Sequence, residues 1–85
     1  MNDLIQKIHD VLKSTHFGGP DDLVDVSDGG DDSLHLVVVS RKLDGMRWQE
    51  KHDFIWNVLT AHLTPDEWGQ ISLTIATTPE EIKAS

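Results

Sequence analysis

The sequence predicts an α+β domain, a two-layer sandwich in which helices cover one face of a three-stranded sheet. Apolar residues recur at helical spacing in two segments, residues 3–17 and 48–63. Three short segments, 23–27, 34–40 and 71–77, have the alternating or β-branched composition of strands. The resulting α-β-β-α-β order, with a short helix after it, suits two packed layers. We expect residues 1–85 to form a single domain.

The first helix is expected to begin at Asn2 or Asp3, since either side chain can cap a helix. It ends before Gly18-Gly19-Pro20. Its apolar stripe consists of Leu4, Ile5, Ile8, Val11 and Leu12.

The two strands that follow are expected to pair as an antiparallel hairpin. Residues 28–33, DGGDDS, have the composition of its turn. Residues 34–40 are apolar with little interruption, which predicts the central strand of the sheet.

The second half of the chain begins with a connector, residues 41–47, that turns at Gly45. A helix over 48–63 and a loop over 64–70 follow. In the last strand, alternation predicts Ile71, Leu73 and Ile75 on one buried face. Thr78 and Pro79 then predict the cap and first residue of a short final helix.

The composition excludes several classes of function. The net charge of −8 is the reverse of the usual electrostatic signature of a nucleic-acid-binding protein. The absence of cysteine excludes disulfides and thiolate chemistry in this chain. The longest apolar run, Leu36–Val39, is too short to span a membrane, and the N-terminus has no secretory signal. We therefore expect a cytoplasmic protein without a membrane partner.

No sequence motif of a known catalytic mechanism is present, so we predict that the protein is not an enzyme. The aspartates at 25, 28, 31 and 32 lack the spacing of a calcium-binding loop and are interpreted as a solvated acidic turn.

Residues 40–53, SRKLDGMRWQEKHD, are the most informative stretch, with four of the seven basic residues. This basic quartet is Arg41, Lys42, Arg47 and Lys51. Such a pattern is usual for a solvated loop, and it also suits a contact patch for an acidic partner or a phosphate backbone. His52 and His35 are either structural histidines or metal ligands, since imidazole is a common ligand.

The centre of the chain resembles the BolA-like proteins. Their motif is V-V-V-S, an aromatic or leucine three residues later, a glycine, and then Arg/Lys-His. Here it is present as Val37–Ser40, Leu43, Gly45 and Lys51-His52. The family ending T-P-E-E recurs at residues 78–81. The resemblance implies a class II KH-like fold.

BolA-like proteins are non-enzymatic partners of monothiol glutaredoxins, often across a shared [2Fe-2S] cluster that glutathione also ligates. The resemblance implies that His52 is a cluster ligand, and that no cluster is tightly bound by the chain alone. A second family ligand comes from the loop equivalent to residues 28–33, which here has neither Cys nor His, so His35 just beyond it is the weaker candidate. The implied role is in iron–sulfur or redox homeostasis. The partner-binding residues are expected to be Arg41, Lys42, Gly45, Arg47, Trp48, Lys51 and His52.

Two alternatives remain open. The first is a nucleic-acid-binding transcriptional regulator, which the KH-like order and the basic quartet favour, although Gly45-Met46-Arg47-Trp48 lacks the second glycine of a GXXG loop. The second is a protein-interaction module whose partner is not a glutaredoxin.

Overall fold

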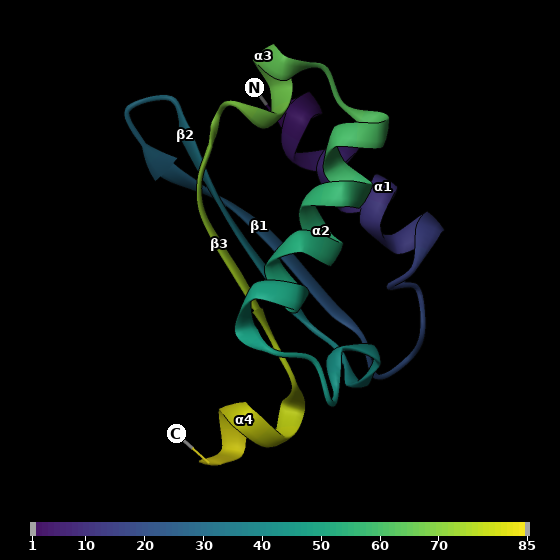
Figure 1. Ribbon diagram of the computed structural model, residues 1–85. Helices are drawn as coiled ribbons and strands as arrows, with labels where there is room; N and C mark the ends of the chain where they lie inside the picture. Colours follow the sequence, from purple (N-terminus) through teal and green to yellow (C-terminus); the bar gives the residue numbers. More distant parts are fainter. Residues whose placement is uncertain (1, 85) are drawn as a thin grey trace.

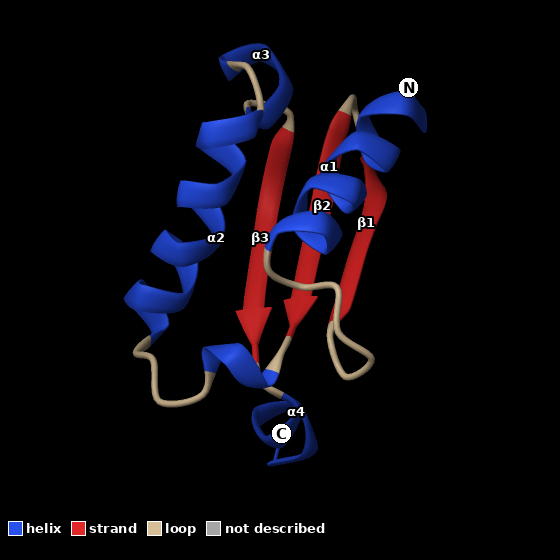
Figure 2. Ribbon diagram, turned by 90° about the vertical axis from the view of Figure 1, so that its right-hand side faces the viewer, coloured by secondary structure: helices blue, strands red, loops and turns tan. Residues whose placement is uncertain are grey.

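Two helices lie against one face of a three-stranded sheet in the computed structural model, which describes residues 2–84 (Figures 1 and 2). The helices of this layer are α1 (Asn2–Thr15) and α2 (Trp48–His62). The strands are β1 (Leu23–Gly30), β2 (Ser33–Val39) and β3 (Ile71–Thr77). Three short helices complete the chain: η1 (Arg41–Leu43), α3 (Pro65–Trp68) and α4 (Pro79–Ala84). The α+β prediction and the α-β-β-α-β order are therefore confirmed.

The sheet has the strand order β1-β2-β3, with β2 in the middle as its apolar sequence predicts. Strands β1 and β2 are antiparallel, while β2 and β3 are parallel. The connection between these two parallel strands contains η1, α2 and α3. Parallel strands need such a crossover, and here α2 brings the chain back along the sheet before β3 begins. Both β1 and β3 are edge strands.

The β1–β2 hairpin is tighter than predicted. The six-residue turn expected at 28–33 is wrong, because β1 continues to Gly30 and pairs it with Ser33. Only Asp31 and Asp32 form the turn, with φ angles of 51° and 60°. A two-residue hairpin turn of type I′ needs positive φ at both central positions, and aspartate tolerates that backbone better than most residues.

The core lies between the two helices and the sheet. Helix α1 contributes Ile8 and Leu12, both at predicted stripe positions, and α2 contributes Ile55, Val58 and Leu59 from the predicted helical segment 48–63. Phe17, just after α1, and Leu43, the last residue of η1, also enter the core and are fully buried. The remaining core residues are Val24, Leu34, Leu36, Val38, Leu63 and Ile71.

Strand β3 presents different faces from those predicted. Leu34 pairs with Ile71, but His35 pairs with Leu73, so the register shifts by one residue at Ser72. Such a bulge turns every later side chain to the opposite face. Ile71 is therefore buried, whereas Leu73 and Ile75 are 44% and 43% exposed on the face away from the helices. The prediction that all three share a buried face is wrong for this reason.

Capped short helices occupy two segments predicted as irregular. Helix η1 begins after Ser40, whose Oγ accepts a hydrogen bond from the Lys42 backbone N–H at 3.1 Å. Helix α3 begins after Thr64, which forms a reciprocal capping box with Glu67. The turn at Gly45 is confirmed by its φ of 79°. No helix within residues 2–84 has the length and apolarity that crossing a bilayer would need.

Candidate functional site

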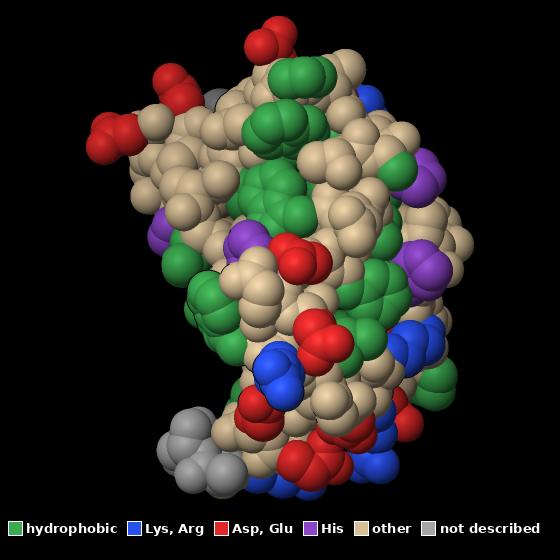
Figure 3. Space-filling view, viewed as in Figure 1, with side chains coloured by type: hydrophobic (Ala, Val, Ile, Leu, Met, Phe, Trp, Pro, Cys, Tyr) green, Lys and Arg blue, Asp and Glu red, His purple; other side chains and the backbone are tan. Residues whose placement is uncertain are grey.

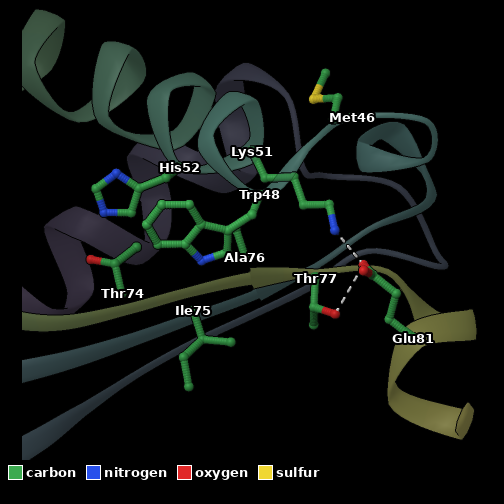
Figure 4. A pocket seen from close by; sticks show the side chains of 9 residues that line it. All are labelled: Met46, Trp48, Lys51, His52, Thr74, Ile75, Ala76, Thr77 and Glu81. Atoms are coloured by element: carbon green, nitrogen blue, oxygen red, sulfur yellow. Dashed lines mark hydrogen bonds and ion pairs between the residues drawn. The ribbon is translucent and has the colours of Figure 1, made fainter. Parts of the chain in front are cut away.

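A pocket of about 390 Å³ opens between the first half of α2, β3 and α4 (Figure 4). Three of the predicted partner-binding residues line it: Trp48, Lys51 and His52. The other lining residues are Met46, Thr74, Ile75, Ala76, Thr77 and Glu81. The fold thus brings part of the motif of residues 37–52 against a strand that begins about twenty residues later in the chain.

An aromatic ladder, defined here as Trp48, His52, Trp56 and Trp68, runs along α2 from the pocket to α3. The Trp48 and His52 rings stack with centroids 6.1 Å apart and planes at 21°, and His52 lies 6.1 Å from Trp56. Trp56 meets Trp68 edge to face at 5.8 Å. The spacing of four residues places Trp48, His52 and Trp56 on one face of α2, and Trp68 joins them from α3. Figure 3 shows hydrophobic side chains gathered in a column on the face that carries α2 and β3.

Trp48 is the most exposed large apolar side chain of the site, at 74% of its area. It stands at the first residue of α2, and its ring hangs between His52 and strand β3 (Figure 4). Exposed tryptophans are enriched in binding surfaces because they offer much contact area with few rotatable bonds.

Lys51 is buried and paired. Only 7% of the residue is exposed, and its Nζ lies 2.5 Å from Glu81 Oε1. The same carboxylate accepts from the Thr78 backbone N–H at 3.1 Å and from Thr77 Oγ1 at 3.3 Å. The hydrogen bond from Lys51 and that from the Thr78 N–H hold the pKa of Glu81 below its usual value, against the opposing effect of desolvation. Lys51 therefore fastens α4 to α2, and the pair brings no net charge to the pocket.

The other members of the basic quartet do not line the pocket, and two of them form ion pairs. Lys42 lies 3.3 Å from Asp22 Oδ2 and also donates to the His16 carbonyl. Arg41 lies 3.7 Å from Glu80. Of the four, Arg47 alone makes no ion pair with a residue of the described chain. Three of the four cations therefore have a carboxylate partner in the same chain, which weakens their attraction for a phosphate backbone.

Asp22 holds residues 40–42, within the motif of residues 37–52, through hydrogen bonds. The Ser40 hydroxyl, which is fully buried, donates to Asp22 Oδ1 at 2.6 Å. The Gly19 backbone N–H donates to Oδ2 at 3.0 Å. The pKa of Asp22 is lowered, chiefly by the hydrogen bond from Ser40 and further by Gly19 and Lys42, while burial opposes them. These bonds attach residues 40–42 to the loop between α1 and β1.

The two candidate metal ligands lie on opposite sides of the sheet. His35 pairs with Ser27 and Leu73 and points to the face away from the helices, where its ring covers Gly29. His52 lies on α2, which covers the other face. Among residues 2–84 no group of three His, Cys, Asp or Glu side chains is placed to hold a metal ion. Within this part of the chain, neither His35 nor His52 therefore belongs to such a group.

The sequence did not indicate the contributions of β3 and α4 to the pocket. Thr74, Ala76 and Thr77 are unremarkable strand residues, and they reach the pocket only because β3 returns parallel to β2 under α2. Glu81 carries a weak signal, since it is three residues after the predicted cap Thr78, where a capping-box glutamate belongs. Its bond to Lys51 has no counterpart in the sequence pattern.

No protein-family model, curated protein or solved structure matches this chain. The resemblance to the BolA-like proteins therefore depends on the motif of residues 37–52, the ending at 78–81 and the order of the elements, and it stays a prediction.

Proposed function

We propose that this protein is a non-enzymatic, cytoplasmic adaptor that binds a monothiol glutaredoxin through the surface at the start of α2. His52 is its ligand to a [2Fe-2S] cluster shared with the glutaredoxin and glutathione. The observation that supports this best is the gathering of Trp48, Lys51 and His52, all from the BolA-like motif region, at one pocket beside the Gly45 turn.

The donor set fits a shared cluster better than a resident one. Iron–sulfur clusters are held by thiolates, with imidazole as the usual substitute, and this chain has no cysteine. An imidazole ligand raises the potential of the iron that it binds, which is the chemistry His52 would supply. Trp48 and Trp56 lie on either side of His52 at 6.1 Å and restrict the orientations that its ring adopts.

The pairing of the basic quartet favours a protein partner over a nucleic acid. Lys51, Lys42 and Arg41 are all engaged with carboxylates of the same chain, so a phosphate backbone would have to displace these pairs. The alternative of a nucleic-acid-binding regulator consequently has less support, and a gel shift across a salt series tests it. A protein-interaction module with another partner would use the same pocket.

Visible circular dichroism tests the proposal directly. A [2Fe-2S]-loaded monothiol glutaredoxin is titrated with the wild-type protein, with His52→Ala and with His35→Ala. We expect a new cluster spectrum with the wild type and with His35→Ala, and its loss with His52→Ala. His35→Ala is the matched control because its ring lies on the other side of the sheet.

Two results would contradict the proposal. If wild-type protein with native far-ultraviolet dichroism leaves the spectrum unchanged, and calorimetry detects no binding, the partner is not a glutaredoxin. If the spectrum changes equally with His52→Ala, the complex forms without ligation by His52.

A further inference from the structure

The two edges of the sheet differ in how they are protected. Strand β1 carries Asp25 and Asp28 and ends in a bulge, which are common means of discouraging another strand from pairing there. Strand β3, ISLTIAT, has no charged residue and no proline in seven positions. An uncharged, β-branched edge is usually covered in a natural protein, because otherwise it pairs with other chains.

Thr74 and Ala76 direct their backbone groups outward from this edge. The Thr77 carbonyl accepts from the Ser40 N–H at 3.1 Å, so the backbone groups of Thr77 point toward β2. Backbone groups alternate along a strand, so those of Ile75 also point inward, while those of Thr74 and Ala76 point away from the sheet. The edge thus presents two donors and two acceptors in the spacing that an extended backbone complements.

A groove runs beside these groups, under α2. Figure 2 shows α2 on the far side of β3 from β2, so the helix overhangs the free edge. The pocket lies in this space, with Trp48 and His52 above it and Thr74 and Ala76 at its floor. Ile75 points to the opposite face, where it and Leu73 are exposed (Figure 4). A strand placed here would meet apolar side chains on both of its faces.

We infer that the groove between β3 and α2 binds an extended segment of a partner protein, which adds to the sheet as a fourth strand beside β3. The outward N–H and C=O groups of Thr74 and Ala76 hold its backbone. A large apolar side chain of the segment enters the pocket against Trp48, and its neighbours in sequence contact Leu73 and Ile75. This inference does not depend on the identity of the partner or on a cluster.

The charges of the site select an uncharged segment. Within residues 2–84, the Lys, Arg, Asp and Glu side chains that line the pocket are Lys51 and Glu81, which neutralise each other. A charged side chain entering the pocket would lose hydration without an unpaired counter-charge to compensate.

A second copy of this chain fits the groove less well than a single strand. Symmetric pairing of β3 with itself would bring the overhanging α2 of each copy into the space above the other copy's β3. Each copy also carries a net charge of −8. A slender extended segment avoids both obstacles.

Selection from a phage-displayed library of random linear dodecapeptides tests the inference. Peptides recovered on the wild-type protein are synthesised, and their dissociation constants are measured with Thr74→Pro and Thr74→Val. Proline removes the outward N–H, which edge strands tolerate, whereas valine keeps it and preserves the side-chain volume. We expect apolar peptides that bind the wild type and Thr74→Val equally, and Thr74→Pro about tenfold or more weakly.

The peptides themselves give a readout that does not depend on the folding of a variant. N-methylation at alternate residues removes the donors on one edge of the peptide only. We expect one alternation to abolish binding and the other to leave it unchanged, and we expect the amides of Thr74 and Ala76 to exchange more slowly in the complex. Trp48→Ala should weaken binding about tenfold, since this exposed side chain forms one wall of the pocket.

Three results would overturn the inference. The first is that no apolar peptide is enriched over the same selection on Trp48→Ala. The second is that both N-methylation patterns bind alike. The third is a concentration-dependent dimer of the wild type that Thr74→Pro dissociates, because the occupant of the edge would then be a second copy.

Discussion

Replacing Asp22 by asparagine tests how strongly residues 40–42 are attached to the loop between α1 and β1. The Asp22 side chain is 7% exposed and accepts hydrogen bonds at both oxygens: from Ser40 at Oδ1, and from Gly19 and Lys42 at Oδ2. Asparagine has one acceptor oxygen, so its amide N–H groups would face the donors of either Ser40 or Gly19. One buried donor is then left without a partner.

The magnitude follows from these contacts. A hydrogen bond to a charged group contributes about 1.5–3 kcal/mol, and the pair with Lys42 adds little because that side chain is 52% exposed. We expect Asp22→Asn to lower the free energy of unfolding by about 2 kcal/mol at pH 7. For a domain of this size that corresponds to a fall in Tm of about 8–16 °C.

The pH dependence of this difference identifies its origin. Because the pKa of Asp22 is lowered in the folded protein, its stabilisation is present above the pKa of the unfolded chain, about 3.9, and is lost as the pH falls through the folded value. The difference in the free energy of unfolding between the wild type and Asp22→Asn should therefore become smaller below about pH 4.

Urea unfolding, followed by tryptophan fluorescence at pH 7, 5 and 3, measures this difference in the free energy of unfolding. Asp21→Asn is the matched control, since Asp21 is an exposed neighbour and its replacement should change little. A gap below about 0.5 kcal/mol at pH 7 would refute the reasoning, since one hydrogen bond to a buried charged group is expected to contribute more. So would a gap of constant size down to pH 3.

Four further predictions concern single contacts. Gly29→Ala should destabilise the protein, because the new Cβ would lie 2.5 Å from His35 Nε2, and His35→Ala should restore stability in the double variant, as urea unfolding would show. Glu81→Gln should speed hydrogen exchange in residues 79–84 more than Glu80→Gln does, because Glu80 forms only an exposed pair with Arg41. Lowering the pH through the depressed pKa of Glu81 should also speed this exchange, because protonation weakens the pair with Lys51. Gly45→Ala should cost about 1 kcal/mol because its φ is 79°, and Gly45→Asn should cost less in the same melting assay. Trp56→Phe should lower Tm by only a few degrees, since the buried indole N–H has no hydrogen-bond partner to lose.

A helix or strand was predictable from the sequence where its apolar residues followed a single helical or strand period along the whole element. Helix α2 begins and nearly ends where its apolar stripe indicates, and β3 has the predicted bounds. The faces of β3 were not predictable, because alternation alone does not reveal the extra residue at Ser72. The tight hairpin was missed for a related reason, since aspartate is only occasionally found at positive φ.

The candidate site was predictable in part. The motif pointed to Trp48, Lys51 and His52, which do meet at one pocket. It gave no information on pairing across the fold, so the burial of Lys51 against Glu81 and the engagement of Lys42 by Asp22 were absent from the prediction. The face of His35 was predictable from alternation along β2, because His35 lies between Leu34 and Leu36 and points to the face opposite those leucines.

The parallel pairing of β2 with β3 has a consequence for synthesis on the ribosome. Strand β2 is complete at residue 39, but its parallel neighbour ends at residue 77, so one side of the most apolar strand stays open while the intervening residues are made. During that interval the nascent chain already contains residues 1–32, with eight aspartates and two lysines, a net charge of −6. Like charges on neighbouring nascent chains repel, and this repulsion opposes aggregation through β2 until β3 arrives. We therefore expect the acidic first third of the chain, which includes the antiparallel partner β1, to lower the tendency of nascent chains to associate through the open edge of β2.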